Sequence, residues 1–145
     1  MDKIAIASDH AGVDLKSEIV SLLKSRGIEV TDMGPSSNDS VDYPDYAQKV
    51  AEKVSLGEAK GILICGTGIG MSIAANKFKG VRAALAHSVE TAKMSREHND
   101  SNILVLGARV LSETLAKEIV EAWLDTPFEG GRHQRRLDKI SDLEK

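Results

Sequence analysis

The strongest constraint on the fold is a set of short, almost unbroken apolar segments. Residues 3–8, 61–65, 81–86 and 102–106 are of this kind, and residues 28–32 form a weaker, alternating segment. A strand that is covered on both of its faces has this pattern, and such strands are typical of parallel sheets. We therefore predict five parallel strands, although the pattern does not reveal their order.

Helical patterns occupy the stretches between these segments. Apolar residues recur at helical spacing in residues 15–23, 43–54 and 111–124, and shorter helices are predicted at residues 69–76 and 88–99. Strands that alternate with helices build βαβ units. The predicted fold is thus an α/β, three-layer, doubly wound (Rossmann-like) sandwich with a five-stranded parallel sheet.

Length and composition suit one domain. The 145 residues are 41% hydrophobic and 28% charged, which is ordinary for a globular chain. We expect residues 1–145 to form a single domain. Its C-terminal tail and helix, at about 128–145, should pack back on the domain or lie at a subunit interface.

Composition also argues against several functions. The net charge is −3 and the aromatic content is 3%. Nucleic-acid partners are therefore not expected, because such binders carry an excess of basic residues and, for single strands, stacking aromatics. There is one cysteine, no signal-peptide pattern and no apolar run long enough to span a membrane. We expect a cytoplasmic protein with no membrane partner.

The first predicted strand ends in two candidate ligand-binding residues, Asp9 and His10. Ligands of open α/β sheets bind at the carboxyl ends of the strands. Each residue alone suits a structural role, as a helix cap or as a solvent-facing side chain. Their adjacency at a strand end favours a functional one.

The third predicted strand runs into the loop 65–71, which holds Cys65 and three glycines and leads into a helix. Glycine lets a backbone approach a ligand closely. Free N–H groups at a helix N-terminus attract anions and favour the thiolate form of a cysteine. The alternative is a buried structural cysteine before a tight turn. Met71 stands where a dinucleotide fingerprint needs glycine and where a cysteine phosphatase needs arginine, and the Walker lysine is absent. The loop therefore resembles an oxyanion cradle beside a thiol.

Further candidates follow along the chain. His98 and Asn99 precede the fifth predicted strand, where they suit either a helix cap or a site. Arg109 follows that strand, and Arg132 and Arg136 lie four residues apart, on one face of a helix. A guanidinium fork matches phosphate oxygens, although a solvated basic face is the alternative. The histidines show no spacing typical of metal ligands, so we expect no metal.

These motifs together resemble those of the ribose-5-phosphate isomerase B type within the ribose/galactose isomerase family. The resemblance extends from the first predicted strand to the terminal helix. It is carried by segments 8–12, 42–44, 61–70, 74–77, 96–100, 107–109 and 129–136. Members that lack the cysteine carry a glutamate just after the glycine loop. Met71 occupies that position here, so the chain is similar to the cysteine type.

The resemblance implies a role for each candidate residue. Cys65 would be the base, Thr67 would support it, and His98 would be the acid that opens the furanose ring. The remaining candidates would bind substrate: Asp9, His10, Tyr43 and Asn99 the sugar, the backbone N–H groups of Gly66, Gly68, Ile69 and Gly70 the enediolate, and Arg109, Arg132 and Arg136 the phosphate.

The resemblance also implies a reaction and an assembly. The enzyme would interconvert ribose 5-phosphate and ribulose 5-phosphate through a cis-enediolate, without metal or cofactor. It would be a homodimer or a dimer of dimers with active sites at the interface. Two alternatives stay open: an isomerase of a six-carbon aldose 6-phosphate such as allose 6-phosphate, and a non-catalytic module that binds a sugar phosphate.

Overall fold

The computed structural model describes residues 3–144, and the sheet that these residues form has five strands, all parallel, in the order β2-β1-β3-β5-β4. The strands are β1 (Lys3–Ser8), β2 (Glu29–Asp32), β3 (Lys60–Cys65), β4 (Ala83–Leu85) and β5 (Ile103–Gly107). This confirms the predicted fold class and all five strands. The expected start of the chain at Met1 and Asp2, and the last residue of the expected C-terminal tail, Lys145, lie outside the described residues.

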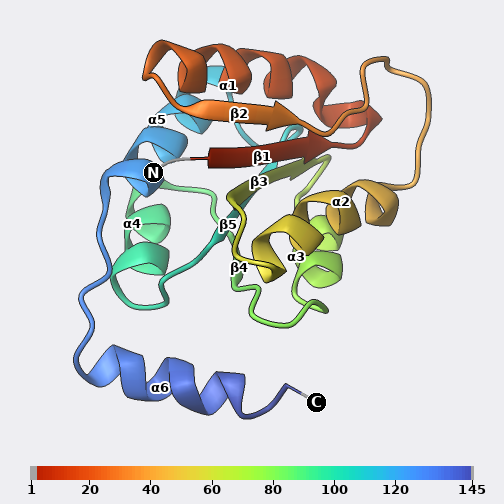
Figure 1. Cartoon of the computed structure of the whole chain (residues 1–145). Helices are drawn as coiled ribbons and strands as arrows, with labels where there is room; N and C mark the ends of the chain where they lie inside the picture. The colour runs from red at the N-terminus through yellow and green to blue at the C-terminus, as the bar shows by residue number, and fades with distance from the viewer. Residues whose placement is uncertain (1–2, 145) are drawn as a thin grey trace.

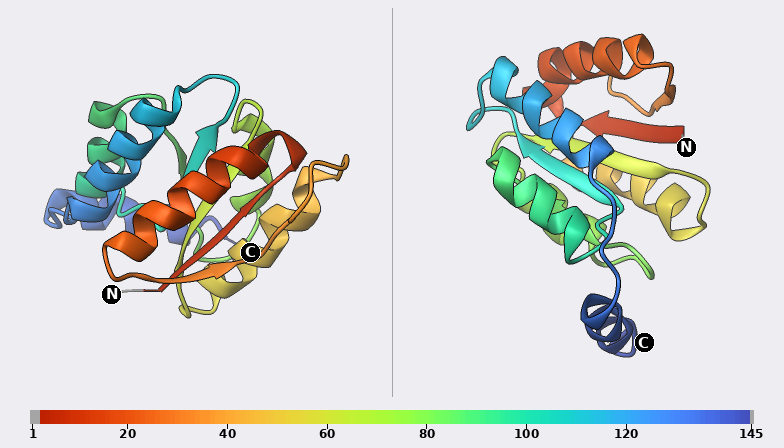
Figure 2. Two further views of the ribbon diagram at one scale, coloured as in Figure 1. Left: turned by 90° about the horizontal axis from the view of Figure 1, so that it is seen from above. Right: turned by 90° about the vertical axis from the view of Figure 1, so that its left-hand side faces the viewer.

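Helices cover both faces of the sheet, as Figures 1 and 2 show. A short 3-10 helix, η1 (His10–Gly12), leads into α1 (Val13–Ser25), which shares one face with α4 (Val89–Glu97) and α5 (Glu113–Asp125). The other face packs against α2 (Tyr43–Ser55) and α3 (Ile69–Ala75). The sandwich therefore has the three layers that the sequence predicts.

The strands are apolar throughout their buried parts because their side chains pack alternately into two separate cores, one on each face of the sheet. In β1, Ile4 and Ile6 face α1 and α5, whereas Ala5 and Ala7 face α2. Successive side chains of a strand point to opposite faces, so both must be apolar when both are covered. Small residues let α2 approach closely: a Cβ on Gly61 of β3 would lie 2.5 Å from Cγ1 of Val50.

The edge strand β4 is shorter than the predicted segment 81–86. Its outer side is closed by the side chain of Asn76, which accepts a hydrogen bond from the Ala83 N–H at 2.9 Å and donates one to the Ala83 carbonyl at 3.0 Å. The amide thus imitates one residue of a neighbouring strand. Natural sheets need such devices because an open edge offers unpaired backbone groups to other chains.

The strand order creates a switch point. The chain leaves β1 for β2 on one side, and then crosses to β3 on the other side of β1. Crossover connections diverge at such a point and leave a crevice outside the carboxyl ends of the two strands. Here the two ends are those of β1 and β3, which lead into Asp9 and into the Cys65 loop.

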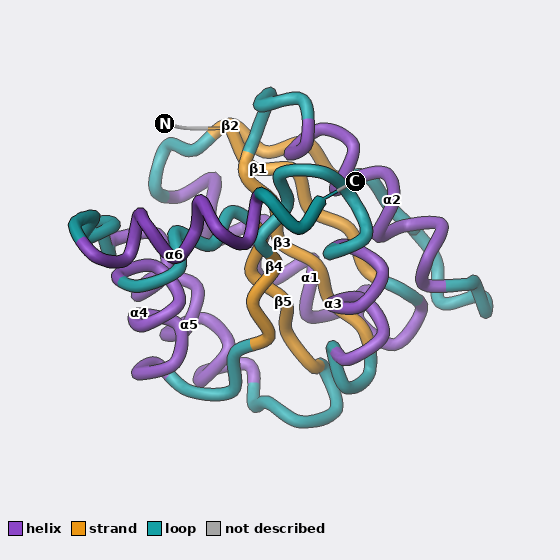
Figure 3. Tube along the Cα trace, turned by 90° about the horizontal axis from the view of Figure 1, so that it is seen from below, coloured by secondary structure: helices purple, strands orange, loops and turns teal. Residues whose placement is uncertain are grey.

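The last helix, α6 (Arg132–Ser141), stands apart from the sandwich beyond the β4 edge (Figures 2 and 3). An extended segment connects it to α5. Contacts with the body lie near the start of α6 and just after its end: the His133 ring stacks on His98 with centroids 4.5 Å apart, and the Gly80 N–H donates to Glu144 Oε2 at 2.6 Å. Between these contacts a cavity of about 300 Å³ remains, lined in part by Asn99, Val81 and Leu137.

Among residues 3–144, none of the helices combines the length and the apolar composition that crossing a membrane requires.

Candidate active site

The thiol of Cys65 lies at the carboxyl end of β3, within the switch point. Its side chain is buried, with 5% of the residue exposed, and Sγ accepts a hydrogen bond of 3.2 Å from the Gly68 N–H. Gly68 has a φ of 82°, and a Cβ there would lie 2.5 Å from Cδ1 of Leu85. Only glycine permits this close turn of the loop around the sulfur.

The Cys65 loop is clamped to the end of β5. The Ala108 N–H donates to the Cys65 carbonyl at 2.8 Å, and the Arg109 N–H donates to the Gly66 carbonyl at 2.9 Å. A Cβ on Gly107 would lie 2.6 Å from the carbonyl oxygen of Thr67, so a larger residue would displace the loop. The same approach brings the Arg109 guanidinium beside Gly66, where a Cβ would meet Nη1 at 3.3 Å. The Arg109 side chain therefore lies at the same edge of the sheet as the Cys65 thiol.

Three further predicted residues gather at the same edge. The Asp9 N–H donates to the Ile64 carbonyl at 3.0 Å, and Asp9 Oδ1 caps η1 by accepting from the Ala11 N–H at 2.9 Å. His10 Nδ1 accepts from the Val41 N–H at 3.2 Å, so Nε2 is the ring nitrogen that can meet a ligand. The Tyr43 ring covers Gly70, where a Cβ would lie 2.5 Å from the ring.

His98 and Asn99 lie at the opposite, amino edge of the sheet. The helix α4 begins after β4 and returns the chain to the start of β5, and His98 caps its C-terminus. Just beyond it, the Asn102 N–H donates to the Arg82 carbonyl at 3.0 Å, beside the start of β4. The structure therefore does not bring His98 and Asn99 to Cys65 within one chain.

Arg132 and Arg136 belong with His98 rather than with Cys65. Both are exposed in the first turns of α6, one turn apart. The neighbouring His133 and Leu137 are buried and face the body. The Glu129 N–H donates to the Glu97 carbonyl at 3.1 Å, which fixes the start of this segment beside the end of α4. The predicted site residues thus form two groups at opposite edges of the sheet.

The structure also brings two residues that the sequence analysis missed, Glu129 and His133, next to His98. One ligand atom from each of His98, Glu129 and His133 lies within 4.8 Å of the others, and His133 Nε2 lies 3.5 Å from Glu129 Oε1. The spacing along the chain did not reveal this group, because it pairs a helix end with a distant segment. Two imidazoles and a carboxylate suit zinc chemically. The His98 and His133 rings are stacked, however, with an angle of 16° between their planes. The nitrogen lone pairs lie in the ring planes, so one ring must rotate before both could bind the same ion.

The chain matches a known protein family over almost its whole length. Residues 4–140 match the family model described as Ribose/Galactose Isomerase. Ribose-5-phosphate isomerase B of Escherichia coli (strain K12) is 53% identical over 145 residues, which cover 99% of this chain and 97% of that protein.

Solved structures agree with the sequence match. Ribose-5-phosphate isomerase B of Clostridium thermocellum is 57% identical with a TM-score of 0.97, over 98% of this chain and 97% of that one. The enzyme of Mycoplasma genitalium, solved with bound ribulose-5-phosphate, is 48% identical with a TM-score of 0.96, over 98% of this chain and 95% of that one. The likeness therefore extends over almost the whole of each chain.

Proposed function

Because the chain belongs to the ribose/galactose isomerase family, we propose that it is an aldose–ketose isomerase that interconverts ribose 5-phosphate and ribulose 5-phosphate. The observation that carries the proposal is the Cys65 thiol at the switch point, with the Gly68 N–H aimed at its sulfur. The ribulose-5-phosphate bound by the Mycoplasma genitalium relative supports the choice of a five-carbon substrate.

Cys65 acts as the base. As a thiolate it takes the proton from C2 of the open-chain aldose, and the electron pair of that C–H bond forms the C1–C2 double bond. The former carbonyl oxygen on C1 becomes the negatively charged oxygen of a cis-enediolate. The proton then returns from sulfur to C1, while the C2 hydroxyl proton moves to the C1 oxygen and leaves a ketone at C2. Thr67 supports the loop, since its Oγ1 accepts from the Ile69 N–H at 3.2 Å.

Backbone N–H groups of the loop stabilise the enediolate. Preorganised donors of this kind are typically worth about 10²–10³ in rate each. Two of the loop amides already have partners within the loop, those of Gly68 and Ile69. We therefore assign the developing charge first to the amides of Gly66, Thr67 and Gly70. The helix α3 has only seven residues, so its dipole is small. We therefore assign the stabilisation of the enediolate to the individual N–H groups of the loop.

A second copy of the chain completes the site. Asp9, His10, Tyr43 and Arg109 stand with Cys65, whereas His98 and Asn99 lie at the other edge. The helix α6 projects from the body and exposes Arg132 and Arg136, which supports a contact with a neighbouring subunit. In this arrangement His98 of one subunit protonates the ring oxygen, and the arginines of that subunit bind the phosphate. The active species is then a homodimer or a dimer of dimers.

Arg136→Ala should mainly weaken binding of the phosphorylated sugar. Hydrogen bonds to charged groups contribute about 1.5–3 kcal/mol, so KM should rise roughly 10- to 100-fold with a small change in kcat. Steady-state kinetics with ribose 5-phosphate measure both constants. The matched control is Arg135→Ala, which removes an exposed arginine from the same helix. Equal KM values for the two variants would contradict the phosphate role.

A direct assay tests the proposed function. Purified protein is treated with EDTA and mixed with ribose 5-phosphate, and ribulose 5-phosphate is followed over time. Turnover that survives EDTA is the expected result. Turnover only with allose 6-phosphate would replace the five-carbon substrate by a six-carbon one. Absence of turnover with both sugars, from protein that binds them, would identify a binding module instead. A cytoplasmic location completes the proposal, because a reactive thiol suits a reducing compartment.

A further inference from the structure

The turn that carries His98 and Asn99 is held in an unusual backbone conformation. Residues 98–102 connect α4 to β5, and Asp100 has a φ of 44°. Among residues 3–144 it is the one non-glycine residue with a positive φ. Such a conformation is disfavoured for residues with a Cβ, although Asp and Asn tolerate it best. Surrounding contacts must therefore maintain it.

Arg96 holds the turn from its buried side. This arginine is 6% exposed, and its Nη1 donates to Asp100 Oδ1 at 2.8 Å and to the Ser101 carbonyl at 2.7 Å. Its Nε donates to the Thr126 carbonyl at 3.2 Å, which ties the turn to the end of α5. A buried guanidinium is stable only when its donors are satisfied, so Arg96 and Asp100 depend on each other.

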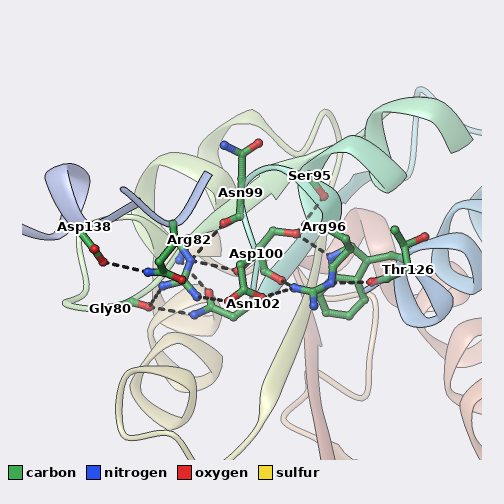
Figure 4. A network of polar contacts seen from close by, with 12 residues as sticks. Gly80, Arg82, Ser95, Arg96, Asn99, Asp100, Asn102, Thr126 and Asp138 are labelled. Carbon is green, nitrogen blue, oxygen red and sulfur yellow. Dashed lines mark hydrogen bonds and ion pairs between the residues drawn. The ribbon is translucent and has the colours of Figure 1, made fainter. Parts of the chain in front are cut away.

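Arg82 holds the same turn from the β4 side. Its Nε donates to the Asp100 carbonyl at 2.9 Å and to the Asn99 carbonyl at 3.2 Å, and its Nη2 lies 3.4 Å from Asp100 Oδ2. Figure 4 shows the result: the backbone of Asn99 is bound into the network, whereas its side-chain amide points away from it. The network thus fixes the position of the Asn99 side chain through its backbone, while the side-chain amide itself takes no part in the network.

Asp100 also balances a cluster of positive charge. Lys60, at the start of β3, is about half buried, and burial lowers its pKa. Arg96 lowers the pKa of Lys60 further by repulsion, while Asp100 opposes this effect. One carboxylate thus stands among Arg82, Arg96 and Lys60. Without that charge, the three cations would repel one another around the turn.

We propose that Asp100, clamped between Arg82 and Arg96, is a positioning residue that presents His98 and Asn99 to the substrate. This inference rests on the proposed function, since it concerns the residues expected to open the sugar ring and to hold the sugar. Asp100 itself touches no substrate. It acts through the backbone of the two residues that precede it, because its carboxylate and its carbonyl bind two arginines on opposite sides of the turn.

The test uses Asp100→Asn and Arg82→Gln. Asparagine tolerates the positive φ, so Asp100→Asn removes the charge and leaves the backbone preference intact. Arg82→Gln removes the donors from the Asn99 and Asp100 carbonyls, and it serves if the first variant folds poorly. Misplacement of a catalytic group by about 1 Å can cost about 10²-fold in rate. We expect kcat/KM with ribose 5-phosphate to fall about 10- to 100-fold in each variant.

A double-variant cycle separates positioning from a loss of stability. Asp100→Asn is also made in a His98→Ala background. If Asp100 acts through His98, its fold-loss should shrink at least about threefold there, because part of what it positions is already gone. The same fold-loss in both backgrounds would overturn the proposal, and so would kcat/KM within twofold of the wild type. The control Arg26→Gln breaks surface ion pairs to Asp125 and Glu121 and should leave kcat/KM unchanged.

Hydrogen exchange gives a readout that needs no turnover. Amides of residues 98–101 should exchange faster in Asp100→Asn and Arg82→Gln than in the wild type, whereas strand β1 should keep its protection. Unchanged exchange in the turn would contradict the positioning role. If the wild type lacked isomerase activity, the proposed reaction would fail, and the exchange data would still decide whether this network orders the turn.

Discussion

Replacing Cys65 with alanine should lower kcat for ribose 5-phosphate by about 10²–10⁴-fold, because positioned general bases typically contribute that much. The variant should still fold. Cys65 lies on the α2 and α3 side of the sheet, and its loss removes one buried sulfur, with an expected destabilisation of roughly 1–2 kcal/mol. Steady-state kinetics measure the first effect, and urea unfolding measures the second.

Cys65→Ser is the matched control for packing. Serine has nearly the size of cysteine and can accept the hydrogen bond from the Gly68 N–H, but its hydroxyl is far less acidic than a thiol. Both variants should therefore be inactive to a similar degree, although the serine variant should pack better. Near-normal turnover in either variant would remove Cys65 from the mechanism and would direct attention to Asp9 or His10 as the base.

Mixing two inactive variants should restore activity. Cys65→Ala damages one group of site residues, and His98→Ala damages the group at the opposite edge of the sheet. If each active site combines one group from each of two subunits, a heterodimer of these variants contains one intact site and one doubly damaged site. Random pairing makes half of the dimers heterodimers, so the mixture should regain roughly a quarter of wild-type activity.

The experiment requires subunit exchange and a same-edge control. The two variants are unfolded together in denaturant, refolded as an equal mixture and assayed with ribose 5-phosphate. Cys65→Ala mixed with His10→Ala serves as the control, since both changes lie in the same group and no heterodimer gains an intact site. Recovery in the first mixture alone is the expected result. If the first mixture stays as inactive as its components, the shared site is wrong.

The sequence predicted the strands well because the burial of a strand determines which residue types occur within that short segment. Strands covered on both faces are apolar at successive positions, and the segments that became β1, β3 and β5 show this between their polar ends at Lys3, Ser8 and Lys60. The segment that became β4 was predicted too long. At the sheet edge a side chain, Asn76, replaces a neighbouring strand, and residue type alone does not reveal that substitution.

The candidate residues were found, but their grouping was not. The glycines of the Cys65 loop and the neighbours Asp9 and His10 are visible as unusual residues at predicted strand ends. His98 is equally visible, and its position before a predicted parallel strand, whereas Cys65 ends one, was the signal that the two residues lie at opposite edges. The places of His133 and Asp100 also escaped notice, because one depends on a stacking partner and the other on a backbone angle. For Asp100, the sequence held one signal: it lies four residues after Arg96, a spacing at which two side chains of opposite charge can pair.

The amino-acid sequence by itself determined the secondary structure, the α/β layering and the chemical character of the residues at the strand ends. These features follow from the spacing of apolar side chains and from the backbone freedom of glycine, both of which act over a few residues. Only the tertiary structure decided the strand order, the switch point between β1 and β3, and the stacking of His133 on His98. Those features arise from pairing between segments far apart in the chain, which no local pattern encodes.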